Sequence, residues 1–167
     1  MNIQLLQWRP EFLDSLVLYA NNKKIADNLA DAFPHPYTRE DGMAFIDRAS
    51  TERPTKIFAI SYGADIIGSV GIFPDTDIHR KNAAIAYWIA EPFWGKGAGT
   101  EAIRQITAYG FSTFDIIRIY AKPFGYNIAS HKALENAGFS LEARLENTIY
   151  KNGAFSDELI YRLMKNI

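Results

Sequence analysis

One stretch just past the middle of the chain limits how the polypeptide can fold. Residues 87–102 read as an apolar strand, then Pro92, then three glycines at every second position, and then the opening of a helix. A helix that begins at such a turn presents unpaired backbone N–H groups and the positive end of its dipole at one place. Lys96 adds a positive charge there. The stretch therefore predicts a strand–turn–helix unit that binds a phosphate or pyrophosphate.

Two common phosphate-binding loops do not fit this turn. A Walker-type loop has Ser or Thr after its lysine, whereas Lys96 is followed by Gly97. A dinucleotide-binding fingerprint has G-x-G-x-x-G spacing in an early strand–helix–strand unit. The spacing here is G-x-G-x-G, and it comes late in the chain. A glycine turn that binds no ligand is the alternative that the turn by itself leaves open.

Length and composition fit one folded domain over residues 1–167. The 167 residues are 48% hydrophobic and 14% aromatic, which is enough apolar surface for a substantial core. A formal net charge of −1 gives no reason to expect nucleic acid or an anionic membrane as a partner. The sequence shows no apolar run near the ~20 residues of a membrane-spanning helix and no signal-peptide pattern, so we expect a cytoplasmic protein.

The absence of cysteine limits the chemistry. A chain without cysteine has no disulfides, no thiolate metal ligands and no covalent cysteine intermediate. Its histidines, His35, His79 and His131, are scattered and show no H-E-x-x-H spacing, so we expect no metal site. If the protein is an enzyme, direct transfer between two bound substrates is favoured.

Hydrophobic periodicity predicts an α+β protein with a mixed, largely antiparallel sheet of six or seven strands and four or five helices. The expected strands are residues 2–8, 56–62, 66–73, 83–90, 116–122, 139–150 and 156–164. The expected helices are residues 10–20, 23–29, 38–51, 97–114 and 128–136. Glycine-containing turns at 63–65 and 151–153 predict two hairpins.

Two separated motifs resemble one family. Residues 87–102 read Y-W-I-x-x-x-F-W-G-K-G-x-G-T-E-A, which is similar to the acetyl-CoA-binding motif of the GNAT superfamily of N-acetyltransferases. With tryptophan at position 94, the motif resembles that of one branch of the family, the ribosomal-protein N-terminal acetyltransferases (RimJ/RimL type). Residues 127–139, N-I-A-S-H-K-A-L-E-N-A-G-F, are similar to that branch's second motif, N-x-A-S-x-x-x-L-E-x-x-G-F. The resemblance covers essentially the whole chain and implies a three-layer α/β fold with splayed central parallel strands.

The resemblance also implies where acetyl-CoA, the co-substrate, binds. Pantetheine would lie between the splayed strands and pair with the backbone of Ile89 and Ala90. The pyrophosphate would lie on the N–H groups of the glycine turn. The implied coenzyme-binding residues are Ile89, Ala90, Trp94, Gly95, Lys96, Gly97, Ala98, Gly99, Thr100, Asn127 and Ser130.

The same resemblance assigns catalytic roles to Ser130 and Asn127. Ser130 would lie near the coenzyme sulfur and protonate the departing thiolate. Asn127 would hydrogen-bond pantetheine or a bridging water. Backbone N–H groups near Ile89 and Ala90 would polarise the thioester carbonyl. The alternative is that Asn127 and Ser130 merely start a helix.

The general base is not evident from the sequence. Relatives often carry glutamate in an A-E-I-G-Y-W pattern, where this chain has Ala84. His79, Glu91, Glu142 or a water chain are the substitutes. A peptide α-amine has a pKa of ~8, whereas neutralising a lysine amine of pKa ~10.4 near neutral pH costs roughly 4–5 kcal/mol. The missing carboxylate therefore favours a terminal or small-molecule amine as acceptor.

Three functions stay open at this point. The first is acetylation of the α-amine of a peptide or ribosomal protein. The second is acetylation of a small-molecule amine such as an amino acid, polyamine or antibiotic, and the third is a non-catalytic acyl-CoA-binding sensor.

The acceptor pocket would be framed by residues 33–37, 75–80 and the final hairpin, where Asp31, Asp75 and Asp77 could attract a cationic amine. We expect a monomer or a homodimer.

Overall fold

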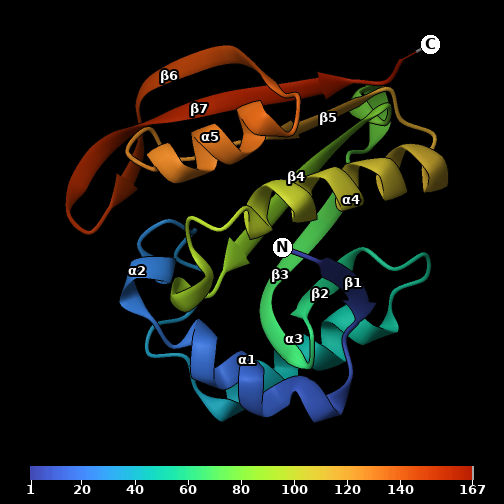
Figure 1. Cartoon of the computed structure of the whole chain (residues 1–167). Helices are drawn as coiled ribbons and strands as arrows, with labels where there is room; N and C mark the ends of the chain where they lie inside the picture. The colour runs from blue at the N-terminus through green and yellow to red at the C-terminus, as the bar shows by residue number, and fades with distance from the viewer. Residues whose placement is uncertain (167) are drawn as a thin grey trace.

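The centre of the structure is one mixed sheet of seven strands in the order β1-β2-β3-β4-β5-β7-β6 (Figure 1). The computed structural model describes residues 1–166. The strands are β1 (Ile3–Gln7), β2 (Ile57–Tyr62), β3 (Asp65–Pro74), β4 (Asn82–Ile89), β5 (Arg118–Ala121), β6 (Ser140–Lys151) and β7 (Ala154–Met164). The expected α+β fold with six or seven strands is confirmed.

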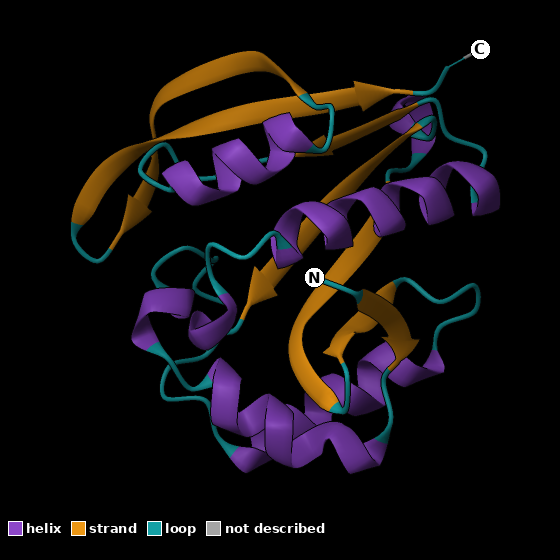
Figure 2. Cartoon of the chain, viewed as in Figure 1, coloured by secondary structure: helices purple, strands orange, loops and turns teal. Residues whose placement is uncertain are grey.

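Helices on both faces of the sheet make three layers (Figure 2). They are α1 (Leu13–Ala20), α2 (Lys23–Ala26), α3 (Arg39–Thr51), α4 (Ala98–Thr113) and α5 (Ile128–Asn136), with 3-10 turns η1 (Pro10–Phe12), η2 (Asp77–His79) and η3 (Glu91–Phe93). Side chains alternate across a strand, so Ile66 of β3 packs with α1 and α3, and the next residue, Ile67, packs with α4 and α5.

Three of the expected elements differ at their ends. Residues 10–12 form the 3-10 turn η1 instead of the first turn of α1, and α2 ends at Ala26 instead of residue 29. β5 begins at Arg118 rather than residue 116, because the amide of Ile117 donates to the carbonyl of Lys81, 2.8 Å away, in the loop before β4. No helix within residues 1–166 is both long and apolar enough to cross a membrane.

The strands β4 and β5 run parallel and then separate. Residues 82–84 of β4 pair with residues 118–120 of β5. The other neighbouring strands described in residues 1–166 pair antiparallel. The register ends with the pair Ala84 and Tyr120, so the second half of β4 leaves β5 and a wedge opens between the two strands. This confirms the expected splayed central pair.

The β6–β7 hairpin reaches back to the N-terminal half of the chain. Asn152 and Gly153 have φ angles of 53° and 76°, which suits a tight two-residue hairpin turn. Lys151 Nζ lies 3.0 Å from Asp31 Oδ1, and Asn152 Nδ2 donates to Asp27 Oδ1 at 2.9 Å. The hairpin tip is thereby joined to the end of α2 and the segment that follows it.

Candidate functional site

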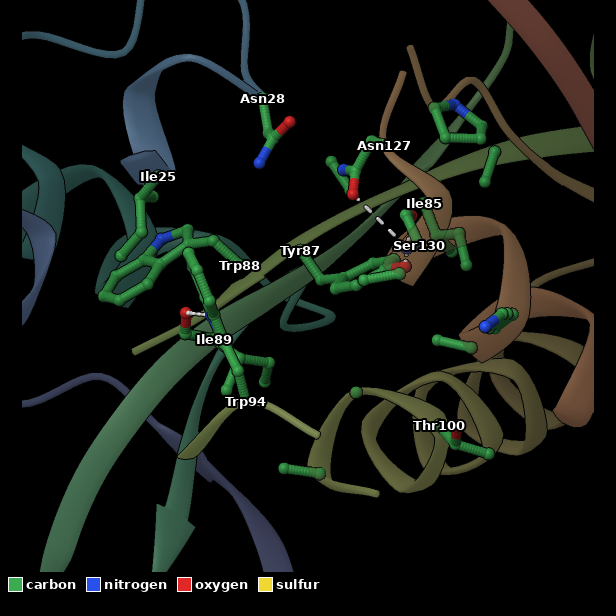
Figure 3. A pocket seen from close by; sticks show the side chains of 18 of the residues that line it. Ile25, Asn28, Ile85, Tyr87, Trp88, Ile89, Trp94, Thr100, Asn127 and Ser130 are labelled. Carbon is green, nitrogen blue, oxygen red and sulfur yellow. Dashed lines mark hydrogen bonds between the residues drawn. The ribbon is translucent and has the colours of Figure 1, made fainter. Parts of the chain in front are cut away.

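A pocket of about 560 Å³ fills the wedge between β4 and β5 (Figure 3). Ile85, Tyr87 and Ile89 point to the face covered by α4 and α5, and Ala86 and Trp88 point to the opposite face, because side chains alternate along a strand. Both sets line the pocket. The pocket therefore passes through the sheet, with the N-terminus of α4 on one side and the open end of β4 on the other.

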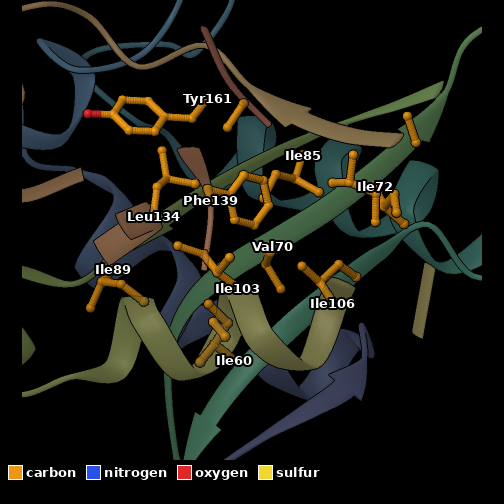
Figure 4. Packing of buried hydrophobic residues seen from close by; sticks show 14 of the residues in the cluster. Ile60, Val70, Ile72, Ile85, Ile89, Ile103, Ile106, Leu134, Phe139 and Tyr161 are labelled. Carbon is orange, nitrogen blue, oxygen red and sulfur yellow. The ribbon is translucent and has the colours of Figure 1, made fainter. Parts of the chain in front are cut away.

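Part of the pocket wall belongs to the main hydrophobic core (Figure 4). Ile103 of α4 and Leu134 of α5 are fully buried in the same cluster as Ile85 and Ile89 of β4. Close packing of this kind resists displacement of one element from another. The two helices and the strand therefore hold the pocket at a fixed width.

The glycine turn forms one end of the pocket as the sequence predicts. Gly95 and Gly97 have φ angles of +71° and +85°, and a Cβ built at either position has no heavy atom within 4 Å. Gly97 is the N-cap of α4, and its carbonyl accepts from the amide of Glu101 at 3.1 Å. The amides of Ala98 and Thr100 in the first turn therefore have no acceptor within the helix. They lie at a hollow edged by glycine, which suits an anion.

Lys96 does not reach this hollow. Its side chain is exposed, and Nζ lies over the ring of Phe93, 5.8 Å from the centroid. Lys96 is absent from the pocket wall, whereas Gly95, Gly97, Ala98, Gly99 and Thr100 all line it. The attraction for an anion at the turn therefore comes from backbone amides rather than from a lysine.

Trp94 fixes the end of β4. Its indole Nε1 donates to the carbonyl of Ile89 at 2.7 Å. The amide of Ala90 donates to Ile67 at 2.7 Å, and its carbonyl accepts from Phe93 at 2.9 Å. The expectation that Ala90 presents exposed backbone groups to pantetheine is therefore wrong. Successive residues of a strand point their amides to opposite sides, so the amide of Ile89 faces away from β3 and into the wedge.

Ser130 and Asn127 meet the pocket at the start of α5. The Ser130 hydroxyl lies 2.5 Å from the Tyr87 hydroxyl, and Asn127 Oδ1 accepts from the Ser130 amide at 3.3 Å as the N-cap of α5. Burial raises the pKa of Tyr87 to about 12 against the smaller opposing effect of the Ser130 hydrogen bond. The two hydroxyls are therefore neutral near pH 7. Sequence reasoning missed Tyr87, although its alternation with Ile85 and Ile89 gives the face on which it lies.

The carboxylates considered as substitutes for the strand glutamate are already engaged. Glu91 accepts from Lys24 Nζ at 2.5 Å and from Asn22 at 2.7 Å, and these hydrogen bonds lower the pKa of Glu91. Glu142 lies 2.8 Å from Arg118 and 2.9 Å from Arg162. Both side chains are therefore held by cations outside the pocket wall.

The third substitute, His79, also fails to reach the pocket. It is an exposed residue of η2, outside the pocket wall. Within residues 1–166, no three His, Asp or Glu side chains gather closely enough to hold a metal ion.

Comparison with known proteins identifies the family. Residues 2–140 match the model of the acetyltransferase (GNAT) domain. The chain belongs to the GNAT family. Its fold, its enzyme class and its use of acetyl-CoA follow from that membership, and the resemblance seen in the two motifs is confirmed.

Individual relatives in this family differ in what they are named for. The uncharacterized N-acetyltransferase YoaA of Bacillus subtilis is 35% identical over 101 residues, which is 60% of this chain and 56% of that protein. The crystal structure of the microcin C7 self-immunity acetyltransferase MccE with acetyl-CoA and AMP has 31% identity and a TM-score of 0.82, over 98% of this chain and 92% of that one.

The ribosomal branch appears at the level of the fold. RimL, the ribosomal L7/L12 α-N-protein acetyltransferase with coenzyme A, has a TM-score of 0.84 at 20% identity, over 98% of this chain and 94% of that one. The GNAT fold is thus shared with proteins that are named for different roles, microcin self-immunity and ribosomal-protein acetylation.

Proposed function

We propose that this GNAT N-acetyltransferase acts on the α-amine of a peptide or ribosomal protein, with transfer directly from acetyl-CoA. The observation that carries transfer from acetyl-CoA is the pocket in the wedge, which has a glycine-edged hollow at one end and the Tyr87–Ser130 pair on its wall. The hollow is suited to the pyrophosphate and the hydroxyl pair to the sulfur. Ala84, which stands where the resemblance implies a carboxylate, supports an α-amine as acceptor, because a pKa of ~8 leaves part of that amine neutral without a strong base. A cytoplasmic location is part of the same proposal.

In this arrangement the coenzyme runs along β4. The pyrophosphate binds the first-turn amides of α4, and pantetheine pairs with the inward-pointing amide of Ile89. Trp94 stabilises that end of the strand through the Ile89 carbonyl. Asn127 contributes by holding the start of α5, since its side-chain oxygen is the cap.

The Tyr87–Ser130 pair supplies the proton for the leaving group. The phenol is the stronger acid of the two, so Tyr87 donates to Ser130, and the Ser130 proton is left to face the sulfur. As the C–S bond breaks, the thiolate takes that proton and Tyr87 restores it to Ser130. The Tyr87 contact favours this role of Ser130 over a purely structural one, and it also opposes the reading of the domain as a sensor without activity.

The acceptor class is tested by a panel assay of thiol release from acetyl-CoA. The panel contains peptides with a free α-amine, free amino acids, spermidine and an aminoglycoside. We expect the highest kcat/KM with a peptide α-amine. A higher kcat/KM with one of the small molecules would move the assignment to that class, and tight coenzyme binding without thiol release from any amine would favour the sensor.

Replacing Ser130 by alanine is expected to lower kcat about 100-fold, because the thiolate loses its proton donor. The Kd of acetyl-CoA, measured by calorimetry, should change little, since the turn that holds the pyrophosphate is untouched. Ser112→Ala is the matched control, because that hydroxyl lies at the far end of α4 and donates to the carbonyl of Tyr109. A Ser130→Ala enzyme with wild-type kcat would remove Ser130 from the chemistry.

A further inference from the structure

The sheet face opposite α4 and α5 carries an acidic group beside the bottom of the wedge. Ala84 of β4 pairs with Phe73 of β3 and with Tyr120 of β5. The three side chains share this face, because they are directly opposite one another in the register. Tyr120 is the last β5 residue paired with β4, and the pocket wall begins one residue further along each strand, at Ile85 and Ala121.

Asp75 reaches this row from the end of β3. Its amide donates to the carbonyl of Asn82 at 2.9 Å, and the Tyr120 hydroxyl donates to both carboxylate oxygens, at 2.9 and 3.1 Å. The strand β4 lies between β3 and β5, so the Tyr120 side chain must cross β4 to make this contact. The small side chain of Ala84 leaves room for the crossing, which a glutamate at that position would occupy.

The hydrogen bond to Asp75 comes from a neutral phenol. Burial raises the pKa of Tyr120, and the hydrogen bond to Asp75 and the charge of that carboxylate raise it further. Tyr120 therefore stays protonated and remains a donor, which fixes the direction of the carboxylate without neutralising it.

Asp75 differs from Glu142, a carboxylate on β6, in having no cationic partner in the described part of the chain. Glu142 lies between Arg118 and Arg162, whereas Asp75 takes part in none of the ion pairs found in residues 1–166. Two cations lie near the Tyr120 ring, Arg118 at 4.7 Å and Lys122 at 5.8 Å from its centroid. Arg118 pairs with Glu142, and within residues 1–166 neither Arg118 nor Lys122 forms an ion pair with Asp75, so the Asp75 carboxylate can pair with an incoming cation.

We propose that Asp75, oriented by Tyr120, binds the positively charged nitrogen of the acceptor amine beside the bottom of the wedge, where β4 itself carries only Ala84. The inference rests on the proposed function and places the acceptor subsite next to the pocket, whose wall begins one residue beyond Tyr120. Coenzyme binds from the side of α4 and α5, and the amine approaches from the opposite face. Asp75 touches the substrate, and Tyr120 is a positioning residue.

These groups and solvent account for every proton that moves in the transfer. The ammonium held by Asp75 loses one proton to solvent, and the neutral nitrogen attacks the thioester carbonyl. The new C–N bond forms and the C–S bond breaks. The nitrogen loses its second proton to solvent, and the thiolate takes one from Ser130, which Tyr87 and then solvent replace. The net change is an amide, free coenzyme A and one proton released.

The test is steady-state kinetics of Asp75→Asn at saturating acetyl-CoA. The varied substrate is either a tripeptide with a free α-amine or spermidine, whichever gives the wild type the higher kcat/KM. We expect kcat/KM for the amine to fall about 30-fold or more, chiefly through KM, with the Kd of acetyl-CoA unchanged. Wild-type KM should rise as KCl is raised from about 0.05 to 0.5 M, and the variant KM should not, because the attraction is between charges. Tyr120→Phe should raise KM less, by about 3- to 10-fold.

Asp77→Asn is the matched control, since Asp77 is an exposed carboxylate two residues away in η2, and its KM should stay within about twofold of wild type. An Asp75→Asn enzyme with wild-type KM, or one whose KM keeps the wild-type salt dependence, would overturn the subsite and leave the acetyltransferase proposal standing. A wild type that releases no thiol with any amine would overturn the proposed function and the subsite with it.

Discussion

Gly97→Ala is expected to raise the Kd of acetyl-CoA by about 10- to 100-fold. The residue has φ of +85° as the N-cap of α4, a conformation that costs an alanine about 1–2 kcal/mol. Its new Cβ would also stand in the open hollow where the pyrophosphate approaches the backbone amides. Calorimetric titration with acetyl-CoA measures the effect directly.

Gly63→Ala separates the backbone strain of a positive φ from the obstruction of the pyrophosphate by the new Cβ. Gly63 has φ of +60° in the β2–β3 turn, outside the pocket wall, and a Cβ there also has no heavy atom within 4 Å. The two variants should lose similar free energy of unfolding, and Gly63→Ala should bind acetyl-CoA like the wild type. Equal Kd values for Gly97→Ala and the wild type would show that the turn does not bind the coenzyme.

Gly68→Ala is expected to lower the free energy of unfolding by about 3 kcal/mol or more. A Cβ at Gly68 would lie 2.2 Å from the carbonyl oxygen of Trp88 and 3.2 Å from the Cα of Ile89. Both atoms are backbone, so no side-chain rotation relieves the overlap, and β4 must move away from β3. Urea denaturation followed by tryptophan fluorescence measures the loss.

Gly99→Ala is the matched control for this prediction. A Cβ there meets Ala133, Tyr87 and Ile89 at 3.8–3.9 Å, which is ordinary van der Waals contact, and Gly99 lies in the first turn of α4, where alanine is a good helix former. Its free energy of unfolding should be unchanged or slightly higher. If Gly68→Ala is as stable as Gly99→Ala, then β3 and β4 are less tightly packed than the structure has them.

The sequence predicts this fold well where the determinants are local. The strand, the glycine turn and the start of α4 depend on neighbouring residues, and each is where the pattern indicates. The same holds for Asn127 as the cap of α5. Residue 117 shows the limit, because its amide bonds to Lys81 in a loop 36 residues earlier and shortens β5.

The parts of the site that escape prediction depend on register. The Tyr87–Ser130 contact joins β4 to α5, and the Asp75–Tyr120 contact crosses β4 from one neighbouring strand to the other. Neither follows from spacing along the chain. Ala90 shows the reverse case, since a bond to Ile67 on β3 uses the amide that the motif alone would leave free.

The passage of the pocket through the sheet has a kinetic consequence. In the proposed arrangement acetyl-CoA fills the end beside α4 and α5, so the face with Ala86 stays open to the acceptor while the coenzyme is bound. Both substrates then occupy the enzyme together before any product leaves. Double-reciprocal plots at several fixed acetyl-CoA concentrations should therefore intersect instead of running parallel, and mixing enzyme with acetyl-CoA alone should give no burst of free thiol.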